Sequence, residues 1–220
     1  MTNMLSLFEE YPLDELYVCG GCIRDHILTG RVSNDIDLFV NCTRKEFDDL
    51  LTYLRNYGEI QYGQYGSPRF YPTGESIHYI DIVPFYNFIV TRKSISTVTE
   101  LLENFDITAN AIGYHIKTKR FYDPLGGVAD IRAHRLKAVR LDFPEKRVSP
   151  VIPLSTVSVF WFRLLHYHNK LQFSFDRTTF DWIVDNRWRI KDRKQFESCF
   201  YPVVIAPDIL EILEKRIDVY

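Results

Sequence analysis

The stretch GGCIRDHILTGRVSNDIDLFV, residues 20–40, decides the fold of this chain. The short apolar run Leu16–Cys19 comes directly before it and predicts a strand. The paired glycines predict a turn, and the amphipathic run Cys22–Leu28 predicts a helix. Asp35–Val40 alternates acidic with aliphatic residues, which predicts a second strand. This part of the chain therefore has the order strand, glycine turn, helix, strand.

Further elements follow along the chain. Thr43-x-x-Glu46 is a capping box and predicts the start of a helix. Ile77–Val83 is rich in β-branched residues and predicts another strand. Residues 109–123 predict a hairpin, and from about residue 154 the pattern changes to helices.

The predicted fold class is α+β: a mixed sheet of about five strands with helices on one face, followed by a short α-helical domain. Residues 142–153 contain three prolines and are the predicted boundary between the two parts. The predicted domains are residues 1–148 and residues 149–220.

Composition limits the class of protein. The chain has 220 residues, of which 46% are hydrophobic and 25% charged, as in globular proteins. Those values exclude a disordered, collagen-like or coiled-coil chain, and no apolar run approaches the length of a membrane span. The first ten residues carry two acids and no basic region, unlike a secretory signal, and the four cysteines are expected to be reduced. We therefore expect a soluble, cytoplasmic protein.

The net charge of −2 conceals an uneven distribution. Residues 1–130 carry a net charge of −7, residues 131–194 carry +8, and residues 195–220 carry −3. One interpretation is an acidic site for cations followed by a basic surface for an anion. The other is a mosaic of solvated faces that cancel in space. In the basic part, residues 187–194 surround Trp188 with cations, which suits an RNA backbone and a solvated surface equally well.

The turn at Gly20-Gly21 is the first candidate site. Glycines at the start of a helix let backbone N–H groups approach an anion, and the helix N-terminus adds partial positive charge. Arg24, one turn into the helix, has the fork that pairs with a phosphate. The alternative is an ordinary tight turn, since the spacing fits neither the Walker loop nor the Rossmann fingerprint.

Three acids form the second candidate site. Asp35 and Asp37 stand two residues apart in a predicted strand, so both carboxylates point to one face. Two such charges are costly without a cation between them, and their hard oxygens suit Mg²⁺. The alternative is an exposed pair in water. Asp81 lies in an apolar strand, where it needs a partner, and all three acids beside a phosphate-holding turn would make a two-metal phosphoryl-transfer site.

Three segments together resemble a known family. They are GGCIRDHILTGRVSNDIDLFV, FDITANAIGYH and FYDPLGGVADIRAHRLKAV. Their order and spacing are similar to the head domain of class II tRNA nucleotidyltransferases and bacterial poly(A) polymerases, in the DNA polymerase beta nucleotidyltransferase superfamily. The resemblance runs from about residue 16 to residue 140, with a weaker extension around Arg163. It implies a catalytic head followed by a short neck-like domain, with the family's body and tail domains absent.

The resemblance also implies roles for individual residues. The residues that would hold the triphosphate are Gly20, Gly21, Arg24 and Asp25. The metal ligands would be Asp35 and Asp37, with Asp81 as the third acid, and the nucleotide would contact Asp106, Thr108, Asn110 and Arg163. The residues that would couple the head to the next domain are Asp123, Gly126, Gly127 and Asp130. The reaction would be attack of an RNA 3′-hydroxyl, with tRNA as first candidate, on the α-phosphate of ATP or CTP. Two Mg²⁺ ions would activate the hydroxyl and neutralise the departing pyrophosphate.

The chain departs from the family's pattern where the base is selected. The family's neck motif Glu-Asp-x-x-Arg aligns with Thr156, Val157 and Phe160, none of which offers the same hydrogen-bond edge. Two alternatives therefore stay open: transfer of a nucleotide to a protein or small molecule, and an inactive relative that binds tRNA or nucleotide. A second subunit could complete the short neck, so a homo-oligomer is also considered.

Overall fold

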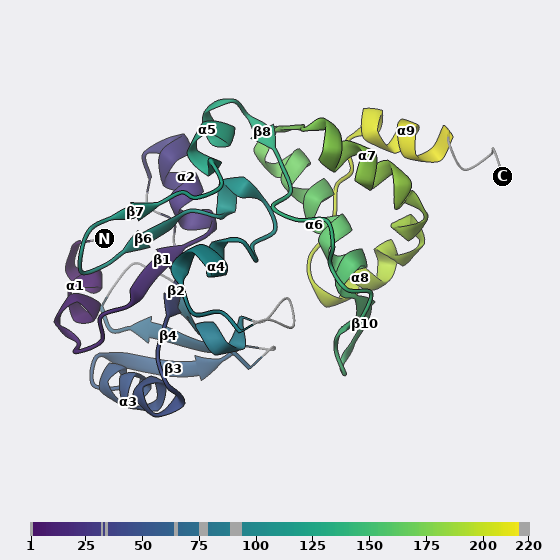
Figure 1. Cartoon of the computed structure of the whole chain (residues 1–220). Coiled ribbons are helices and arrows are strands. Elements are labelled where there is room, and N and C mark those ends of the chain that lie inside the picture. The colour runs from purple at the N-terminus through teal and green to yellow at the C-terminus, as the bar shows by residue number, and fades with distance from the viewer. Residues whose placement is uncertain are drawn as a thin grey trace. The chain divides into compact units, whose positions relative to one another are not determined.

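The chain folds as two compact units, which are described separately. The computed structural model describes residues 2–31, 33, 35–63, 66–74, 79–88 and 94–215. The first unit comprises residues 1–105 and 109–129, and the second comprises residues 106–108 and 130–220 (Figure 1). The two units divide at residues 129–130, whereas the predicted domain boundary lies near residue 148. Strand β8 (Arg135–Leu136) pairs in parallel with β11 (Ser174–Phe175), and this pairing joins residues 130–148 to the helical unit.

The first unit is built on a mixed sheet. Within the described residues it has seven strands in the order β3-β4-β5-β2-β1-β6-β7. Their bounds are β1 Leu16–Cys19, β2 Asp35–Val40, β3 Gly58–Tyr62, β4 Pro68–Pro72, β5 Tyr79–Pro84, β6 Gly113–His115 and β7 Phe121–Tyr122. Among these seven described strands, β2 and β5 form the one parallel pair. The α+β class and the mixed sheet are confirmed, with more strands than predicted.

The edge strand β3 is easy to miss in the sequence. β3 (GEIQY) has residues that are all at least partly exposed, so it lacks the apolar alternation that marks a half-buried strand. The hairpin predicted over residues 109–123 is observed as β6 and the two-residue strand β7. The strand predicted over residues 77–83 is observed from Tyr79, and residues 77 and 78 lie outside the described part of the chain.

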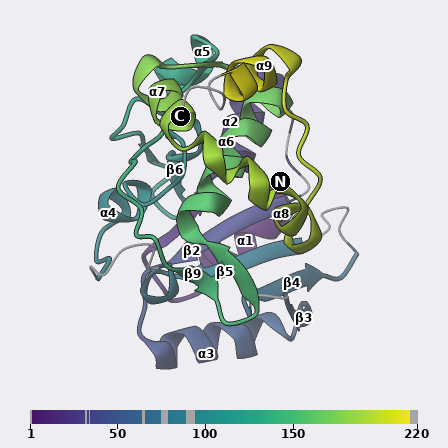
Figure 2. The ribbon, with the colours of Figure 1, turned by 90° about the vertical axis from the view of Figure 1, so that its right-hand side faces the viewer.

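Helices of the first unit lie on both faces of this sheet, not on one face as predicted. They are α1 Thr2–Glu10, α2 Gly21–Thr29, α3 Arg44–Leu54 and α4 Val98–Leu102, with α5 Gly127–Arg132 at the junction of the units. α2 packs on the face of Val18 and α4 on the face of Cys19. The predicted capping box starts α3, since Thr43 accepts from the backbone of Glu46. α3 lies beside β3 in Figure 1 and in the turned view of Figure 2.

Alternation along β1 separates the two faces. Val18 lines an apolar cavity together with Ile23 of α2 and Ile36 of β2. Its neighbour Cys19 points to the other face, where its sulfur and Val98 of α4 both approach Gly113. The face with α2 carries fully buried aliphatic side chains, including Leu38, Ile80 and Ile82. The opposite face is therefore the one that can carry polar side chains.

The second unit is mainly helical. Its helices are α6 Thr156–Leu171, α7 Arg177–Asp185, α8 Arg193–Cys199 and α9 Pro207–Lys215, with a 3-10 segment at Arg187–Asp192 and a hairpin of β9 Arg147–Ser149 and β10 Ile152–Ser155. α6 begins at Ser155, whose side chain accepts from the backbone of Ser158. Trp161 and Phe162 of α6 are fully buried, and the Trp161 indole donates to the carbonyl of Ile183. These aromatics are therefore core residues of the second unit.

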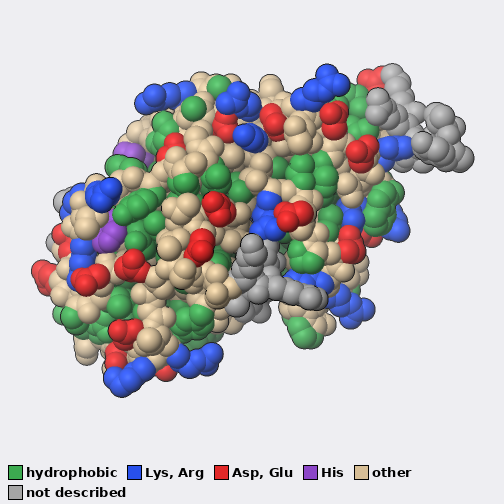
Figure 3. All heavy atoms as spheres, viewed as in Figure 1, with side chains coloured by type: hydrophobic (Ala, Val, Ile, Leu, Met, Phe, Trp, Pro, Cys, Tyr) green, Lys and Arg blue, Asp and Glu red, His purple; other side chains and the backbone are tan. Residues whose placement is uncertain are grey.

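Charges of both signs are interspersed on the surface shown in Figure 3. Among the described residues, no helix combines the length and the apolar character needed to cross a bilayer.

Candidate active site

The three predicted carboxylates lie on one face of the sheet. Asp35 and Asp37 are two residues apart in β2, separated by the buried Ile36. β5 runs parallel to β2, and in its register Asp81 stands directly beside Asp37. Because side chains of paired residues share a face, Asp37 and Asp81 point the same way as Asp35. Ile80 and Ile82, on the other face, are fully buried and hold β5 in this register.

The turn after β1 lies against this face. Gly20 has φ +88° and ψ −150°, a conformation that is essentially restricted to glycine. A Cβ atom added to Gly20 would lie 3.1 Å from Asp37 Oδ2 and 3.6 Å from Cε1 of Phe105. Glycine is therefore required for two reasons, the backbone angle and the close approach of the carboxylate. The turn and the Asp37 carboxylate form one continuous surface.

Arg69 also belongs to this face, although it is not among the site residues predicted from the sequence. It is the register partner of Asp81 in the antiparallel pair β4–β5. Its Nε donates to Asp81 Oδ1 at 2.9 Å, and its guanidinium lies 4.5 Å from the ring centre of Tyr79. Burial works to lower the pKa of Arg69, but the hydrogen bond and the charge of Asp81 outweigh burial and raise it. Asp81 thus has a cationic partner supplied by the protein.

Tyr79 shows that the acids act on a common region. Burial raises the pKa of its phenol, and the negative charge of Asp35 raises it further, while Arg69 opposes this. Asp81 and Asp37 add smaller effects in the same direction as Asp35. The pKa of the Tyr79 hydroxyl is therefore raised by all three acids of this face.

The three acids are not gathered around a single point. Over the described residues, no group of three or more His, Cys, Asp or Glu side chains is close enough to hold a metal ion. For Asp81 the physical reason is its ion pair with Arg69, because Asp81 Oδ1 faces the guanidinium and is not directed at a site shared with the other two acids. Asp35 and Asp37 still offer hard carboxylate oxygens from one strand face, the ligand type that suits Mg²⁺.

Arg24 is buried inside the first unit. It is 3% exposed, and its Nε donates to Asp25 Oδ1 at 2.8 Å while Nη1 donates to Asn110. A Cβ atom on Gly21 would lie 3.1 Å from Arg24 Nη2, so the second glycine leaves room for this side chain. The structure brings these four predicted residues together, with the arginine bracing the turn. A phosphate contact by Arg24 would require this cluster to open, whereas the backbone of the turn needs no such change.

The remaining predicted residues form separate groups. In the second unit, Arg163 Nε donates to Asp106 Oδ2 at 3.0 Å, and its Nη2 contacts Asp106 and the hydroxyl of Tyr167. Also there, Thr108 donates to Asp130, which forms an ion pair with Arg135.

Asp123 of the first unit caps the start of α5. Its carboxylate accepts from the backbone of Gly127 at 2.6 Å and of Val128 at 3.1 Å. Gly126, just before the helix, has φ +74°, which favours glycine. These residues stabilise the local turn.

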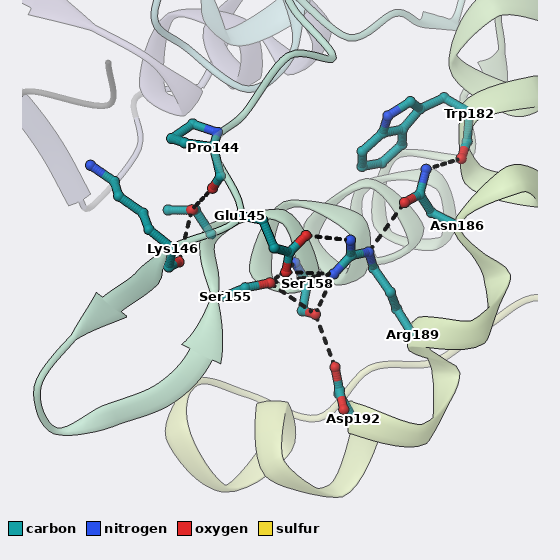
Figure 4. A network of polar contacts seen from close by, with 10 residues as sticks. Pro144, Glu145, Lys146, Ser155, Ser158, Trp182, Asn186, Arg189 and Asp192 are labelled. Carbon is teal, nitrogen blue, oxygen red and sulfur yellow. Dashed lines mark hydrogen bonds and ion pairs between the residues drawn. The ribbon is translucent and has the colours of Figure 1, made fainter. Parts of the chain in front are cut away.

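The basic segment around Trp188 is partly internal. Arg189 is 4% exposed and donates from Nη2 and Nη1 to both carboxylate oxygens of Glu145, at 2.6 and 3.1 Å (Figure 4). Nη1 also donates to Ser158, whose hydroxyl donates to Asp192. The guanidinium of Arg189 is therefore buried within the second unit and bonded there to protein partners, so it is not exposed to solvent.

Comparison with known proteins gives one consistent result. The family model described as "Poly A polymerase head domain" matches residues 16–137. The chain matches none of the curated proteins with which it was compared by sequence.

Solved structures of CCA-adding enzymes have the same fold. The apo form of a CCA-adding enzyme is 19% identical with a TM-score of 0.66, over 99% of this chain and 51% of that chain. A CCA-adding enzyme with CTP is 19% identical with a TM-score of 0.62, over 99% and 49%. The Thermotoga maritima CCA-adding enzyme complexed with tRNA is 20% identical with a TM-score of 0.60, over 90% and 42%. The chain thus spans about half the length of these structures.

Proposed function

Because the chain belongs to the family of poly(A) polymerase head domains, we propose that it is a template-independent nucleotidyltransferase that transfers a nucleoside monophosphate from a nucleoside triphosphate to an RNA 3′ end. The proposed donors are ATP and CTP, and the first candidate acceptor is tRNA. The observation that carries this proposal is the row of Asp35, Asp37 and Asp81 on one face beside the Gly20 turn.

Each part of this face has a task in the reaction. Asp35 and Asp37 would hold Mg²⁺, with Asp81 beside them. Bound there, Mg²⁺ would favour ionisation of the attacking hydroxyl and neutralise the leaving pyrophosphate. The N-terminus of α2, which begins at the partly exposed Gly21, would offer backbone N–H groups to the triphosphate. Orientation of the phosphate for in-line attack then follows from fixed backbone and strand positions.

Base choice is proposed to differ from that of a Glu-Asp-x-x-Arg template. The aligned residues Val157 and Phe160 have no polar side-chain atoms and are at most 6% exposed, and the Thr156 hydroxyl donates to the backbone carbonyl of Lys146. A site that does not hydrogen-bond the base rejects the wrong base weakly. We therefore expect ATP and CTP both to serve as donors, with rates that differ by less than about a hundredfold.

The test is incorporation of α-³²P label from each triphosphate into a mixed small-RNA pool, with Mg²⁺ or with EDTA. We expect Mg²⁺-dependent incorporation that falls at least about a thousandfold in Asp35→Ala and Asp37→Ala. Asp49→Ala removes an exposed acid of α3 and is the matched control. Equal incorporation by wild type and both active-face variants would refute the proposal. Label that enters only added protein or small molecules would support the alternative acceptor class.

A further inference from the structure

A row of charges crosses three strands of the candidate active face. In register, Arg69 of β4 stands beside Asp81 of β5, and Asp81 stands beside Asp37 of β2. Paired residues of adjacent strands are about 5 Å apart, so one cation and two neighbouring anions stand side by side over a short distance. The guanidinium of Arg69 thus lies where it competes directly with any cation that approaches Asp81.

The fold holds this guanidinium from three sides. Asp81 accepts a hydrogen bond from Arg69 Nε, and the ring centre of Tyr79 lies 4.5 Å from Arg69 Cζ. On the third side is the backbone of Gly63, where an added Cβ atom would lie 3.2 Å from Nε and 3.3 Å from Cζ of Arg69. Glycine at this end of the β3–β4 hairpin leaves the space that the guanidinium occupies. The position of Arg69 is therefore specified by the surrounding chain.

The ion pair itself is built to open. It uses a single hydrogen bond to Oδ1, and the side chains of Arg69 and Asp81 are 34% and 23% exposed. Partly exposed pairs of this kind contribute little free energy, because water solvates both partners when they separate. A divalent ion brings twice the charge and direct oxygen coordination, so it competes favourably for the carboxylate.

We propose that Arg69 is a positioning residue that holds the Asp81 carboxylate on the active face and yields it when a divalent cation binds there. This inference rests on the proposed function for the role of the cation. In the cation-free protein the ion pair offsets the repulsion between Asp81 and Asp37. Arg69 therefore lowers the apparent affinity for the cation, and removing it raises that affinity.

The experiment measures binding of Mn²⁺ to the full chain by the loss of the electron paramagnetic resonance signal of the free ion. We expect Arg69→Ala to lower the Kd for Mn²⁺ by about five- to tenfold, and Asp81→Asn in the Arg69→Ala background to reverse that gain. Arg69→Lys keeps the positive charge and should restore an affinity within about twofold of wild type. Arg177→Ala removes a cation that is 94% exposed in the second unit and is the control.

A second variant leaves the arginine in place. Gly63→Ala should shift the guanidinium by a few tenths of an ångström, weaken its contact with Asp81, and lower the Kd by less than Arg69→Ala does. Unchanged or weaker binding by Arg69→Ala and Gly63→Ala, or the absence of Mn²⁺ binding in every variant, would overturn the inference. Tighter binding without nucleotide transfer would leave the inference standing and reject the proposed function. Transfer with unchanged Mn²⁺ affinity would do the opposite.

Discussion

Two arginine–carboxylate pairs, one in each unit, use the same chemistry for different ends. Arg69 makes one hydrogen bond to Asp81, and its side chain is 34% exposed. Arg189 is 5% exposed in its side chain, engages both oxygens of Glu145, and also donates to Ser158 (Figure 4). The number of hydrogen bonds that the guanidinium makes and its exposure therefore distinguish the two pairs. The Arg69 pair can exchange its partner for water or an ion, whereas the Arg189 pair is fixed in place.

The physical basis of this difference is desolvation. A buried guanidinium must have its donors satisfied within the protein, so loss of one partner leaves the others uncompensated. A partly exposed guanidinium exchanges its partner for water or for a competing ion at low cost. The second unit thus uses its pair as a structural link between the β9–β10 region and the 3-10 segment, while the first unit keeps its pair available to ligands.

The largest effect on stability is expected from Arg189→Ala. It removes a fork that joins Glu145, Ser158 and Asn186, and should lower the free energy of unfolding by about 2–3 kcal/mol. Urea unfolding followed by tryptophan fluorescence measures this loss. Arg177→Ala, on the exposed face of α7, should change it by less than about 0.5 kcal/mol. A loss no larger than that of the control would show that the two pairs do not differ as described.

Gly20→Ala should have the next largest effect, and in the first unit. Its backbone angles strain any other residue by about 1–3 kcal/mol, and its new Cβ would press on the Asp37 carboxylate. Both stability and nucleotide transfer should therefore fall.

Gly30→Ala provides the control for backbone angle alone. Gly30 has φ +68°, and an added Cβ would meet nothing within 4 Å. It should lower stability by about 1 kcal/mol and leave transfer unchanged. Equal loss of transfer in both glycine variants would contradict the contact between the turn and Asp37.

The fixed pair should also appear in the pH dependence of stability. The hydrogen bond from Arg189 lowers the pKa of Glu145 in the folded protein, against the opposing effect of burial. The contribution of the Arg189–Glu145 pair to the free energy of unfolding is therefore fully present above the ordinary glutamate pKa, about 4.3. This contribution disappears as the pH falls through the lowered pKa of Glu145. The difference in unfolding free energy between wild type and Glu145→Gln should shrink between pH 6 and pH 3. A constant difference over this range would refute the assignment.

The smallest effect is expected from Arg69→Ala. Because its pair with Asp81 is partly exposed and singly bonded, the free energy of unfolding should change by less than about 1 kcal/mol. The same urea titration measures it. A loss as large as that of Arg189→Ala would mean that Arg69 is a fixed structural link and not an exchangeable partner of Asp81.

Local patterns predicted much of this arrangement. The strand Asp35–Val40 and the capping box at Thr43 are encoded by neighbouring residues, so the sequence alone predicts both. The pairing of Arg69 with Asp81 depends on the register between two strands, β4 and β5, which the sequence of the connecting residues 73–78 does not specify in advance. Burial of Arg24 also depends on a distant residue, Asn110, and so could not be read from the spacing of the turn.

The boundary between the units shows the same limit. Three prolines mark a break near residue 148, but the actual division depends on the pairing of β8 with β11, which are far apart in the sequence. Local composition predicts where a chain turns, while long-range pairing decides which segments fold together.

The central claim is that the face bearing Asp35, Asp37 and Asp81 binds a nucleoside triphosphate together with a divalent ion. The most direct measurement is equilibrium binding of labelled ATP and CTP, with Mg²⁺ and with EDTA, to wild type, Asp37→Asn and Glu145→Gln. We expect binding that requires Mg²⁺, weakens at least about tenfold in Asp37→Asn, and is unchanged in Glu145→Gln. Nucleotide binding that ignores Mg²⁺ and survives Asp37→Asn would contradict it.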